Sequence, residues 1–296
     1  MKTLLYIILP LFLYNCKNQP LQENTPNQTN ESSTIQSNKS IIDTIALLDE
    51  EPIEFTKEKI NPLKKQKLIK LSDDKEQLST LVIEEKLYKK NDFYILDYKY
   101  PRLNEGLDTD YASFNTFFTE NYLNIEVTEN EILDDKFIYC DSAGVSRCMD
   151  KRIIDYKIYA ANERLISVLL YKENYYSGMK HSTYMFECLN YDLTDYNFKY
   201  FGDFFINNAE KKVFNIINKI ITAQIYSGEL YMDCWEIAEE DFRVYKNNFV
   251  INDTNLEYYF DDCIICPSYT GTYSISIPIT DVMHLLKKYN APQKLL

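Results

Sequence analysis

The sequence contains few of the residues that define several special classes of protein. Of its 296 residues, two are histidine, six are glycine, nine are proline and one is tryptophan. Such low glycine and proline contents exclude collagen-like and glycine-rich architectures. No segment approaches the roughly 20 consecutive apolar residues that a membrane-spanning helix needs. The length suits one large domain or two smaller ones, with enough chain to bury a core.

Basic side chains are scarce in comparison with acidic ones. The chain has 32 Lys and Arg residues against 45 Asp and Glu residues, which gives a net charge of −13. Nucleic-acid binders obtain much of their affinity from Lys and Arg contacts with phosphates, so this balance argues against nucleic acid as a partner. The hydrophobic fraction of 45 % is ordinary for a globular protein and argues against global disorder.

Tyrosine and phenylalanine are abundant, with 26 and 16 residues. Tyrosine-rich surfaces suit protein interfaces, because the ring buries a large area at a modest entropy cost. An AT-rich genome raises the tyrosine content as well, so composition alone does not name a function.

The first sixteen residues have the pattern of an export signal that ends at a cysteine. Lys2 provides a basic start, and Leu4 to Leu13 form a ten-residue apolar region that only Pro10 interrupts. A short apolar segment after a basic residue is typical of a secretory signal and not of a membrane span. Cys16 resembles the cysteine of a bacterial lipobox, in which the thiol receives a diacylglycerol and becomes the mature N-terminus. The alternative is an ordinary secreted protein in which Cys16 has no such role.

We therefore expect residues 1–15 to be a lipoprotein signal peptide. The mature chain is expected to be extracytoplasmic and anchored through lipidated Cys16 to a bacterial membrane, either inner or outer. Residues 16–45 are polar and lack aromatic side chains, which predicts a flexible tether. Residues 46–77 mix charges with scattered apolar residues and predict a weakly ordered lead-in. Removal of the signal peptide removes Lys2, so the mature chain has a net charge of −13 − 1 = −14.

Six cysteines remain after Cys16, and an even number favours disulfides in an exported chain. Cys140 and Cys148 flank the turn signal Asp141-Ser-Ala-Gly144, which lies between two strand-like runs. This arrangement favours a disulfide between these two cysteines, across the neck of a hairpin.

The Cys263-Ile-Ile-Cys266 motif is compatible with three interpretations. A redox motif needs its first cysteine at a helix N-terminus, whereas this one follows a strand-like run and precedes Pro267. A zinc site needs a second such pair or two nearby histidines, and the only histidines are His181 and His284. We favour structural disulfides or buried thiols, and we expect neither a metal nor a cofactor.

Apolar periodicity predicts mainly antiparallel sheets with a few packed helices, which is an α+β fold. The run 165–171 is apolar at both alternating sets of positions, so this strand is expected to be buried on both faces. Strands are expected at residues 81–83, 93–100 (closed by Pro101), 136–139, 152–159, 165–171, 183–193, 249–251, 256–260 and 273–279. Helices are expected at residues 110–118, with Tyr111, Phe114, Phe118 and Tyr122 on one face, at 209–221, with Asn208 as N-cap, and from Thr280 to Leu286.

Four segments of the chain also match, in order, the motifs of a known family. They are Tyr100-Pro-Arg-Leu with the helix containing Asn115, the run from Leu165 through Tyr175-Tyr-Ser-Gly-Met-Lys-His181 to Asn190-Tyr-Asp-Leu193, Phe201-Gly-Asp-Phe-Phe205, and the segment from Phe249 through Pro267 and Gly271 to Ile277-Pro. Together they resemble the extracytoplasmic domain pair of the RsiV anti-sigma factors and the PdaC deacetylases, domains of unknown function.

The resemblance implies two intimately associated subdomains, expected at residues 78–173 and 174–296. It implies a sensor that binds lysozyme, as in RsiV, or a domain that accompanies an enzyme acting on peptidoglycan, as in PdaC. The family's Gly-Gly-Ala-His-Gly turn appears here as Ser177-Gly-Met-Lys-His-Ser182, so we expect a differently shaped turn. The chain has neither a transmembrane helix leading to an anti-sigma segment nor the deacetylase's Asp-His-His metal site.

We therefore expect a non-catalytic binding or sensor module of the cell envelope, with lysozyme or another cationic protein as its partner. A body with a net charge of −14 attracts a basic partner and raises the association rate at low salt. The alternative is an accessory domain that contacts peptidoglycan or another glycan. An envelope hydrolase is less favoured, because glycosidase chemistry needs two carboxylates about 5–10 Å apart. The candidate runs, Glu239-Glu-Asp241 and Asp261-Asp262, are typical of solvated surfaces.

Individual residues receive the following interpretations. Gly178 and His181 are turn or recognition residues; we favour for His181 a hydrogen bond that orients the turn over a role in recognition or metal binding. His284 is expected to lie in the last helix, as a packing residue or as one that interacts with the dipole at the C-terminus of that helix. Asp203 is expected to cap a turn, and Trp235 is expected to lie in the core.

Overall fold

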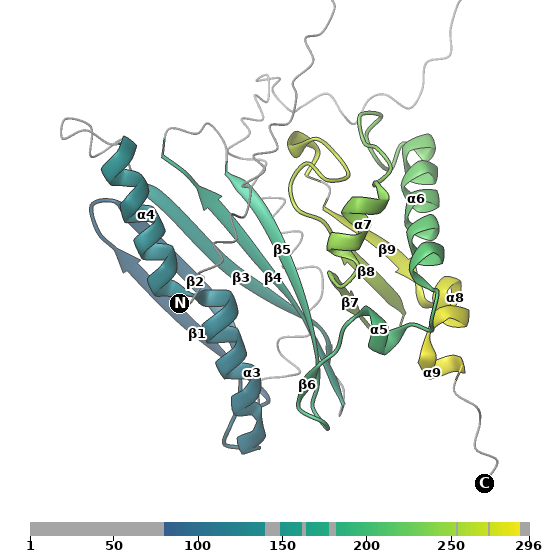
Figure 1. The fold of residues 1–296 in the computed structure, drawn as a ribbon, viewed down its shortest axis with the longest axis horizontal. Helices are drawn as coiled ribbons and strands as arrows, with labels where there is room; N and C mark the ends of the chain where they lie inside the picture. The colour runs from purple at the N-terminus through teal and green to yellow at the C-terminus, as the bar shows by residue number, and fades with distance from the viewer. Residues whose placement is uncertain are drawn as a thin grey trace, which may run out of the picture. The chain divides into compact units, whose positions relative to one another are not determined.

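The structure is a computed structural model that describes residues 80–139, 149–161, 164–177, 182–252, 254–271 and 273–290. All of them belong to one compact unit, Asn61–Leu296. Two sheets and several helices make up the described residues (Figure 1), which confirms the expected α+β fold. No helix in these ranges is long and apolar enough to cross a membrane.

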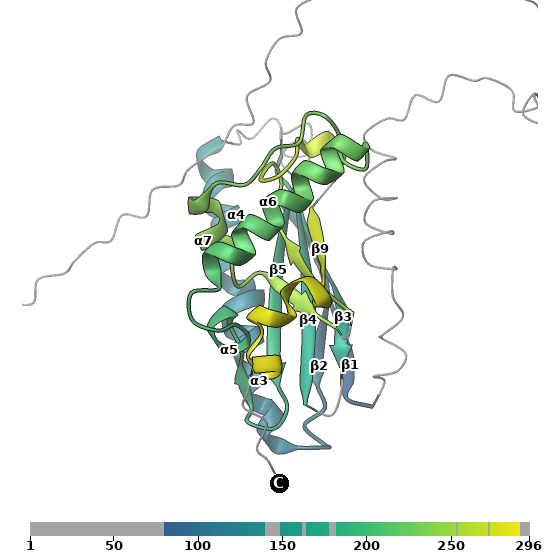
Figure 2. The same cartoon turned by 90° about the vertical axis from the view of Figure 1, so that its right-hand side faces the viewer.

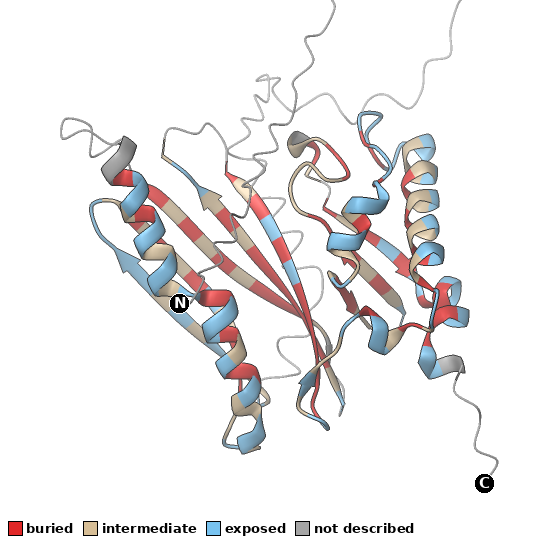
Figure 3. Ribbon diagram, in the orientation of Figure 1, coloured by how far each residue is buried: buried red, intermediate tan, exposed pale blue. Residues whose placement is uncertain are grey.

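Six strands form the larger sheet, in the order in which they occur in the chain. Neighbouring strands are antiparallel, except that β2 and β3 run parallel. β4 is buried on both faces over residues 166–171, as its continuous apolar run predicts (Figure 3). The strands are β1 (Val82–Lys90), β2 (Tyr94–Leu103), β3 (Asp150–Ala161), β4 (Leu165–Tyr175), β5 (Thr183–Asp192) and β6 (Asn197–Phe198).

A helical crossover joins the parallel strands β2 and β3, so the hairpin expected around residues 136–160 is wrong. Residues 136–139 form the last turn of a helix and not a strand, and Ile132 and Lys136, one helical turn apart, are both buried. Parallel strands cannot be joined by a tight turn and need a crossover connection. The crossover contains η1 (Thr109–Tyr111), α3 (Ala112–Phe117), η2 (Phe118–Leu123) and α4 (Ile125–Tyr139).

The crossover helices cover one face of the larger sheet (Figures 1 and 2). The aromatic face predicted for the first helix is confirmed: Phe114, Phe118 and Tyr122 are buried and Tyr111 is half-buried. Pro101 does not close β2, because the strand continues past it in pairing with β1. The parallel pairing with β3 has ended by then, so one side of β2 has no ladder at Pro101, and proline is tolerated there.

The smaller sheet is an antiparallel meander covered by α6 (Glu210–Ser227), which packs against β9. Val213, Ile217 and Ile221 of α6 are buried in this second core, which confirms the predicted apolar stripe. The strands are β7 (Phe249–Ile251), β8 (Asn255–Tyr259) and β9 (Ser274–Pro278). The other helices are α5 (Phe201–Phe204), α7 (Glu239–Tyr245), η4 (Ser268–Thr270), α8 (Ile279–Val282), η5 (Met283–Leu285) and α9 (Lys287–Asn290).

Two of the predicted helix caps are wrong. The N-cap of α6 is Ala209, and Asn208 before it has a φ of 65°. Asparagine tolerates this left-handed conformation, but a side-chain cap needs an extended backbone at its own position. Thr280 lies inside α8, whose N-cap is Pro278.

Polar side chains next to the strands of the smaller sheet cover the edge of β5. The Asn248 side chain accepts the Cys188 amide at 2.7 Å and donates to the Phe186 carbonyl at 2.9 Å. The Asp261 carboxylate accepts the Phe186 amide at 2.8 Å. These bonds satisfy backbone groups that an edge strand otherwise leaves unpaired, and they join the two sheets.

The boundary expected between residues 173 and 174 falls inside β4, and the larger sheet continues through β5 and β6. Buried residues of the second core begin at Phe201. The division into two subdomains at that boundary stays a prediction. Side chains from both sheets meet in a third buried cluster, formed by Leu169, Tyr171, Tyr184, Phe186, Cys188, Val250, Tyr259 and Tyr273.

Candidate functional site

The site residues predicted from the sequence lie outside the described residues. These are the lipidation residue Cys16, the disulfide candidates Cys140 and Cys148, and the turn residues Gly178 and His181. Ser177 and Ser182, which the structure does describe, flank residues 178–181 in the sequence. The Ser177 amide donates to Asp150 at 2.7 Å, and the Ser182 hydroxyl donates to the buried Glu173 carboxylate at 3.0 Å.

A buried ion cluster lies beside Ser177. Lys136 Nζ is 2.5 Å from one Asp150 carboxylate oxygen, and an Arg152 nitrogen is 2.9 Å from the other. Burial alone would raise the pKa of Asp150, but the bonds from Lys136 and Ser177 and the charge of Arg152 outweigh it and lower that pKa. All three charges are paired within the protein. The cluster therefore has the features of a structural element and not of a binding site.

A different surface, absent from the sequence predictions, has the features of a binding site. It runs from Tyr226, at the end of α6, to Asp241, in the first turn of α7, and we call it the 226–241 surface. Its inward positions are Leu230, Cys234 and Ile237, which are buried in the second core, and Phe242 follows as a fourth buried anchor. Most of the intervening residues are exposed, so the segment contacts the core through one residue in every three to five.

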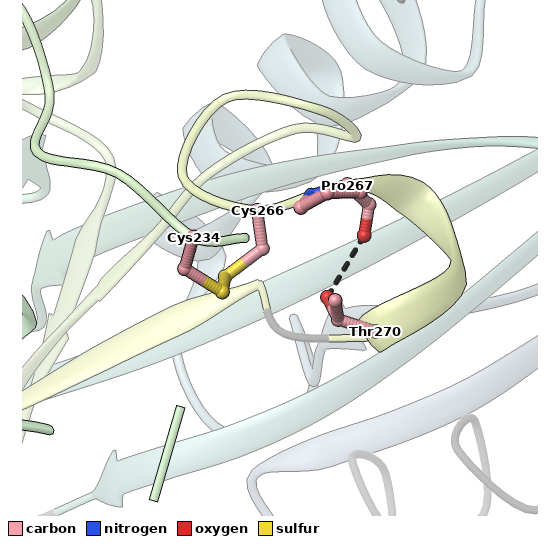
Figure 4. The surroundings of a disulfide bond; sticks show 4 residues. All are labelled: Cys234, Cys266, Pro267 and Thr270. Carbon is pink, nitrogen blue, oxygen red and sulfur yellow. Dashed lines mark hydrogen bonds between the residues drawn. A yellow bond between two sulfur atoms is a disulfide. The ribbon is translucent and has the colours of Figure 1, made fainter. Parts of the chain in front are cut away.

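Covalent and backbone bonds fix this segment in place. A disulfide joins Cys234 to Cys266 beside Pro267, with a Cα–Cα distance of 4.1 Å (Figure 4). The Trp235 amide donates to the Ile265 carbonyl at 2.9 Å, and the Leu230 amide donates to the Gln224 carbonyl at 3.0 Å.

Side chains of α6 fix it further. The Asn218 amide group donates to the Ile237 carbonyl at 3.0 Å and accepts the Ile237 amide at 2.9 Å. The Thr222 hydroxyl donates to Glu236. These contacts form one wall of a shallow groove of about 700 Å³ along α6, lined by Phe214, Asn215, Asn218, Lys219, Thr222, Ala223, Tyr226, Glu236 and Ile237.

Large apolar side chains are exposed along the 226–241 surface. The exposed fraction is 87 % for Tyr226, 57 % for Tyr231, 82 % for Met232 and 41 % for Trp235. The expectation that Trp235 lies in the core is therefore wrong, because its neighbour Cys234 takes the inward position. Several exposed large apolar residues within one short segment are uncommon on monomeric proteins and mark interaction sites. Tyr, Trp and Met are also enriched in protein interfaces.

Acidic residues alternate with these apolar side chains. Six Asp and Glu residues and no Lys or Arg occur between Tyr226 and Phe242. Glu239 and Glu240 are exposed in the first turn of α7, where the helix dipole favours negative charge, as the interpretation of this run as solvated predicts. The six are Glu229, Asp233, Glu236, Glu239, Glu240 and Asp241.

The described cysteines have structural roles. Cys266 pairs with Cys234 and not with Cys263, and Cys263 is itself disulfide-bonded, which supports the structural interpretation of the CxxC motif. Cys188 is a free thiol, and its burial raises its pKa well above the ordinary value. Within the described ranges, no group of three His, Cys, Asp or Glu side chains is arranged to hold a metal.

The remaining sequence interpretations have mixed outcomes. Asp203 accepts the Tyr200 amide at 2.8 Å, which confirms its capping role. His284 lies exposed in η5. The interpretation of Asp261-Asp262 as a solvated run is wrong at Asp261, because its carboxylate binds the edge of β5 and burial raises its pKa.

The sequence did contain a signal for the 226–241 surface. From Ile220 to Phe242 no basic residue occurs, while acidic residues alternate with Tyr, Met and Trp. Composition averaged over the whole chain conceals this run.

No protein-family model matches the sequence, and a search of curated proteins found no match. Two solved structures of DUF3298 family proteins resemble this one. The protein from Bacteroides fragilis is 15 % identical, with a TM-score of 0.48, covering 69 % of this chain and 92 % of its own. The protein from Pseudomonas aeruginosa is 13 % identical, with a TM-score of 0.48, covering 70 % of this chain and 95 % of its own.

Proposed function

We propose that this protein is a lipid-anchored, non-catalytic binding module of the bacterial cell envelope whose 226–241 surface binds a cationic protein. The observation that supports this most directly is the alternation of six acidic residues with exposed Tyr226, Tyr231, Met232 and Trp235 on a disulfide-linked segment. The anchor is Cys16, on the basis of the signal sequence that precedes it.

Three physical effects favour a cationic protein as the partner. An excess of acidic over basic side chains attracts a positively charged protein and raises the association rate. Exposed aromatic and Met side chains provide the apolar contacts that determine how slowly a complex dissociates. The disulfide and the Asn218 bonds hold the surface in one conformation, so binding loses less entropy.

Lysozyme is the cationic protein to test first. The order of motifs resembles that of the RsiV and PdaC domain pair, and the RsiV domains bind lysozyme. A basic enzyme that attacks the envelope also suits a surface with a net charge of −6, counted as no basic and six acidic residues between Tyr226 and Phe242. The mature chain should be retained on immobilised lysozyme at low salt and released at high salt; absence of retention at low salt would exclude lysozyme.

A matched pair of triple variants tests the location of the site. Glu229→Gln, Glu236→Gln and Glu240→Gln together remove three charges from the 226–241 surface, and glutamine preserves the oxygen that accepts from Thr222. We expect the Kd for lysozyme to rise about tenfold, equivalent to ~1.4 kcal/mol. The control is Glu126→Gln, Glu131→Gln and Asp135→Asn on the exposed side of α4, with the same change in net charge. If both triple variants weaken binding equally, the site is not at this surface.

A glycan partner is the second candidate. It is favoured by the groove along α6, whose lining includes Tyr226, Asn215 and Glu236, because sugar rings pack on aromatic faces and bind amide and carboxylate groups. Sedimentation with purified sacculi distinguishes the two functions. Glycan binding should persist at high salt, whereas binding of a cationic protein should not.

A further inference from the structure

A group of polar side chains lies on the larger sheet, on the face that the crossover helices cover. Lys172 of β4 and Glu187 of β5 are diagonal neighbours on this face, within reach of a long side chain. The Lys172 ammonium lies over the ring of Tyr122, at the end of η2, with Nζ 3.7 Å from the ring centre. Asp261 lies at the edge of β5, where its carboxylate accepts a backbone amide of that strand at 2.8 Å. We call these four residues the Lys172 cluster.

The Lys172 cluster is open to solvent on one side. The first half of β5 alternates between buried and exposed residues (Figure 3), and its exposed positions are Met185 and Glu187. Lys172 and Asp261 are half-buried, and Tyr122 is 3 % exposed. The cluster therefore extends from a buried phenol to an exposed carboxylate, so a small molecule can reach it from solution.

The charges of the cluster interact without forming ion pairs. Lys172 Nζ donates to the Tyr122 carbonyl at 3.1 Å. Glu187 and Asp261 act on Lys172 electrostatically, but neither carboxylate lies at ion-pair distance from it. The Glu187 carboxylate likewise has no hydrogen bond or ion pair with a residue that the structure describes. The buried ion cluster at Asp150, in which every charge has a partner, is the opposite case.

The Tyr122 hydroxyl is buried and has no hydrogen-bond partner within the described part of the chain. Burial raises the pKa of Tyr122 well above its ordinary value, and the charges of Glu187 and Asp261 raise it further. The hydroxyl is therefore within electrostatic range of both carboxylates and belongs to the same cluster. Buried hydroxyls are nearly always hydrogen-bonded, so this one has a donor available for a ligand.

The three charged groups are also less well stabilised than they would be in water. Loss of surrounding solvent lowers the pKa of Lys172 and raises the pKa values of Glu187 and Asp261. A ligand charge of the opposite sign beside each group would supply the missing stabilisation. In partly desolvated surroundings that interaction is stronger than on an open surface.

We propose that the Lys172 cluster binds a small zwitterion of the amino-acid class. The ligand's carboxylate accepts from the Lys172 ammonium and the Tyr122 hydroxyl. Its ammonium donates to the carboxylates of Glu187 and Asp261. A simple amine would leave the lysine and the hydroxyl without partners, and a simple carboxylate would meet two acidic groups. The cluster shares no residue with the 226–241 surface, so this proposal goes beyond the proposed function and does not depend on it.

A series of ω-amino acids from glycine to 6-aminohexanoate tests the proposal on the mature full-length chain. Successive members separate the ammonium from the carboxylate by one more methylene, so the Kd from isothermal titration calorimetry should pass through a minimum. The N-acetyl and amide derivatives of the best member each lack one charge and should bind at least about tenfold more weakly. Absence of binding by every member would overturn the proposal. So would equal binding of either derivative, which would reduce the ligand to an amine or an acid.

Tyr122→Phe separates a binding role from a structural one, because it removes a single oxygen. The hydroxyl has no partner in the described residues, so the urea midpoint should stay unchanged. The Kd for the best ω-amino acid should rise at least about fivefold. Tyr88→Phe, at an exposed tyrosine of β1, is the control and should change neither quantity. An unchanged Kd in Tyr122→Phe would overturn the proposal, and so would a lower urea midpoint, which would assign the hydroxyl a structural partner.

Two charge variants test which end of the ligand each group binds. Lys172→Met should abolish the difference in Kd between the zwitterion and its amide, because the carboxylate then has no cation to bind. Glu187→Gln should instead reduce the difference between the zwitterion and its N-acetyl derivative. The controls are Lys211→Met and Glu131→Gln, two exposed residues elsewhere with the same changes in net charge, and they should leave both differences unchanged. If the Lys172 and Glu187 variants keep these differences, the ligand does not bind at this cluster.

Discussion

Single side chains decide how the 226–241 surface is presented. The Asn218 side chain bonds both the amide and the carbonyl of Ile237. These two backbone groups therefore have partners although Ile237 lies outside any helix or strand. Cys234 is buried and bonded to Cys266, whereas the neighbouring residue, Trp235, is 41 % exposed. A pattern of apolar residues does not reveal such choices, because they depend on partners that are distant in the sequence.

Replacement of Asn218 by alanine should destabilise the protein. The substitution leaves the amide and the carbonyl of Ile237 without partners at a buried position, which costs about 2 kcal/mol. Urea unfolding should show a lower midpoint at an unchanged m-value. Asn215→Ala on the exposed side of the same helix is the control and should change stability by less than about 0.5 kcal/mol. Equal effects of the two substitutions would contradict the role assigned to Asn218.

Asp192 should make stability depend on acid pH. Burial alone would raise its pKa, but bonds from the Thr194 side chain and amide and from Arg164 outweigh it and lower the pKa from 3.8 to about 2. A lowered folded-state pKa stabilises the protein above pH 3.8, and that contribution is lost as the pH falls towards 2. It amounts to no more than about 2 kcal/mol. Asp192→Asn should flatten the unfolding free energy between pH 4 and 2, and an unchanged slope would contradict this assignment.

At the scale of elements, polar side chains join the smaller sheet to the larger one. A disulfide fixes the segment that forms the 226–241 surface. Asn248 and Asp261 cover the edge of β5, and the disulfide joins the segment before α7 to the turn before η4. Asn248, Asp261, Cys234 and Cys266 all lie outside the helices and strands. The regular elements therefore build the core, and the irregular segments between them form the exposed surface.

Removal of the disulfide should affect binding more than secondary structure. Cys234→Ser with Cys266→Ser opens a loop with a sequence separation of 32, which costs about 3–4 kcal/mol by chain entropy. Where the protein remains folded by circular dichroism, lysozyme affinity should fall at least about fivefold, because the surface is no longer preorganised. Cys188→Ser, at the buried free thiol, is the control for loss of a cysteine and should leave affinity unchanged. Equal affinity without the disulfide would show that rigidity is not needed.

The periodicity of apolar residues predicts those helices and strands whose type follows from their own residues. It fails where the order and direction of the strands in the sheet determine which element forms. The strands at β4 and β5, the apolar stripe of α6 and the hairpin of β7 and β8 follow from residue patterns and turn residues. Residues 136–139 also have a strand-like composition, yet they end α4, because the parallel pairing of β2 and β3 demands a crossover. The 226–241 surface is linked to the turn before η4 by the Cys234–Cys266 disulfide, and the sequence alone does not choose this pair among the fifteen pairings that six cysteines allow.

At the scale of the whole molecule, the negative net charge is spread over the chain and is also concentrated in one segment. The chain's net charge of −13 includes −6 from the segment between Tyr226 and Phe242, while residues 57–70 contribute +5. The charge is thus segregated along the chain and not spread evenly. A partner at long range experiences the overall negative field, and a partner in contact meets the acidic 226–241 surface.

This segregation predicts how ionic strength affects binding to lysozyme. The Debye length falls from about 30 Å at 0.01 M salt to about 10 Å at 0.1 M, so long-range attraction weakens while short-range apolar contacts do not. The association rate constant should therefore fall at least about tenfold over this range, and the dissociation rate constant should change by less than about threefold. Stopped-flow fluorescence resolves both constants. If salt acted mainly on dissociation, charged pairs at the contact, and not steering by the field of the whole protein, would determine the affinity.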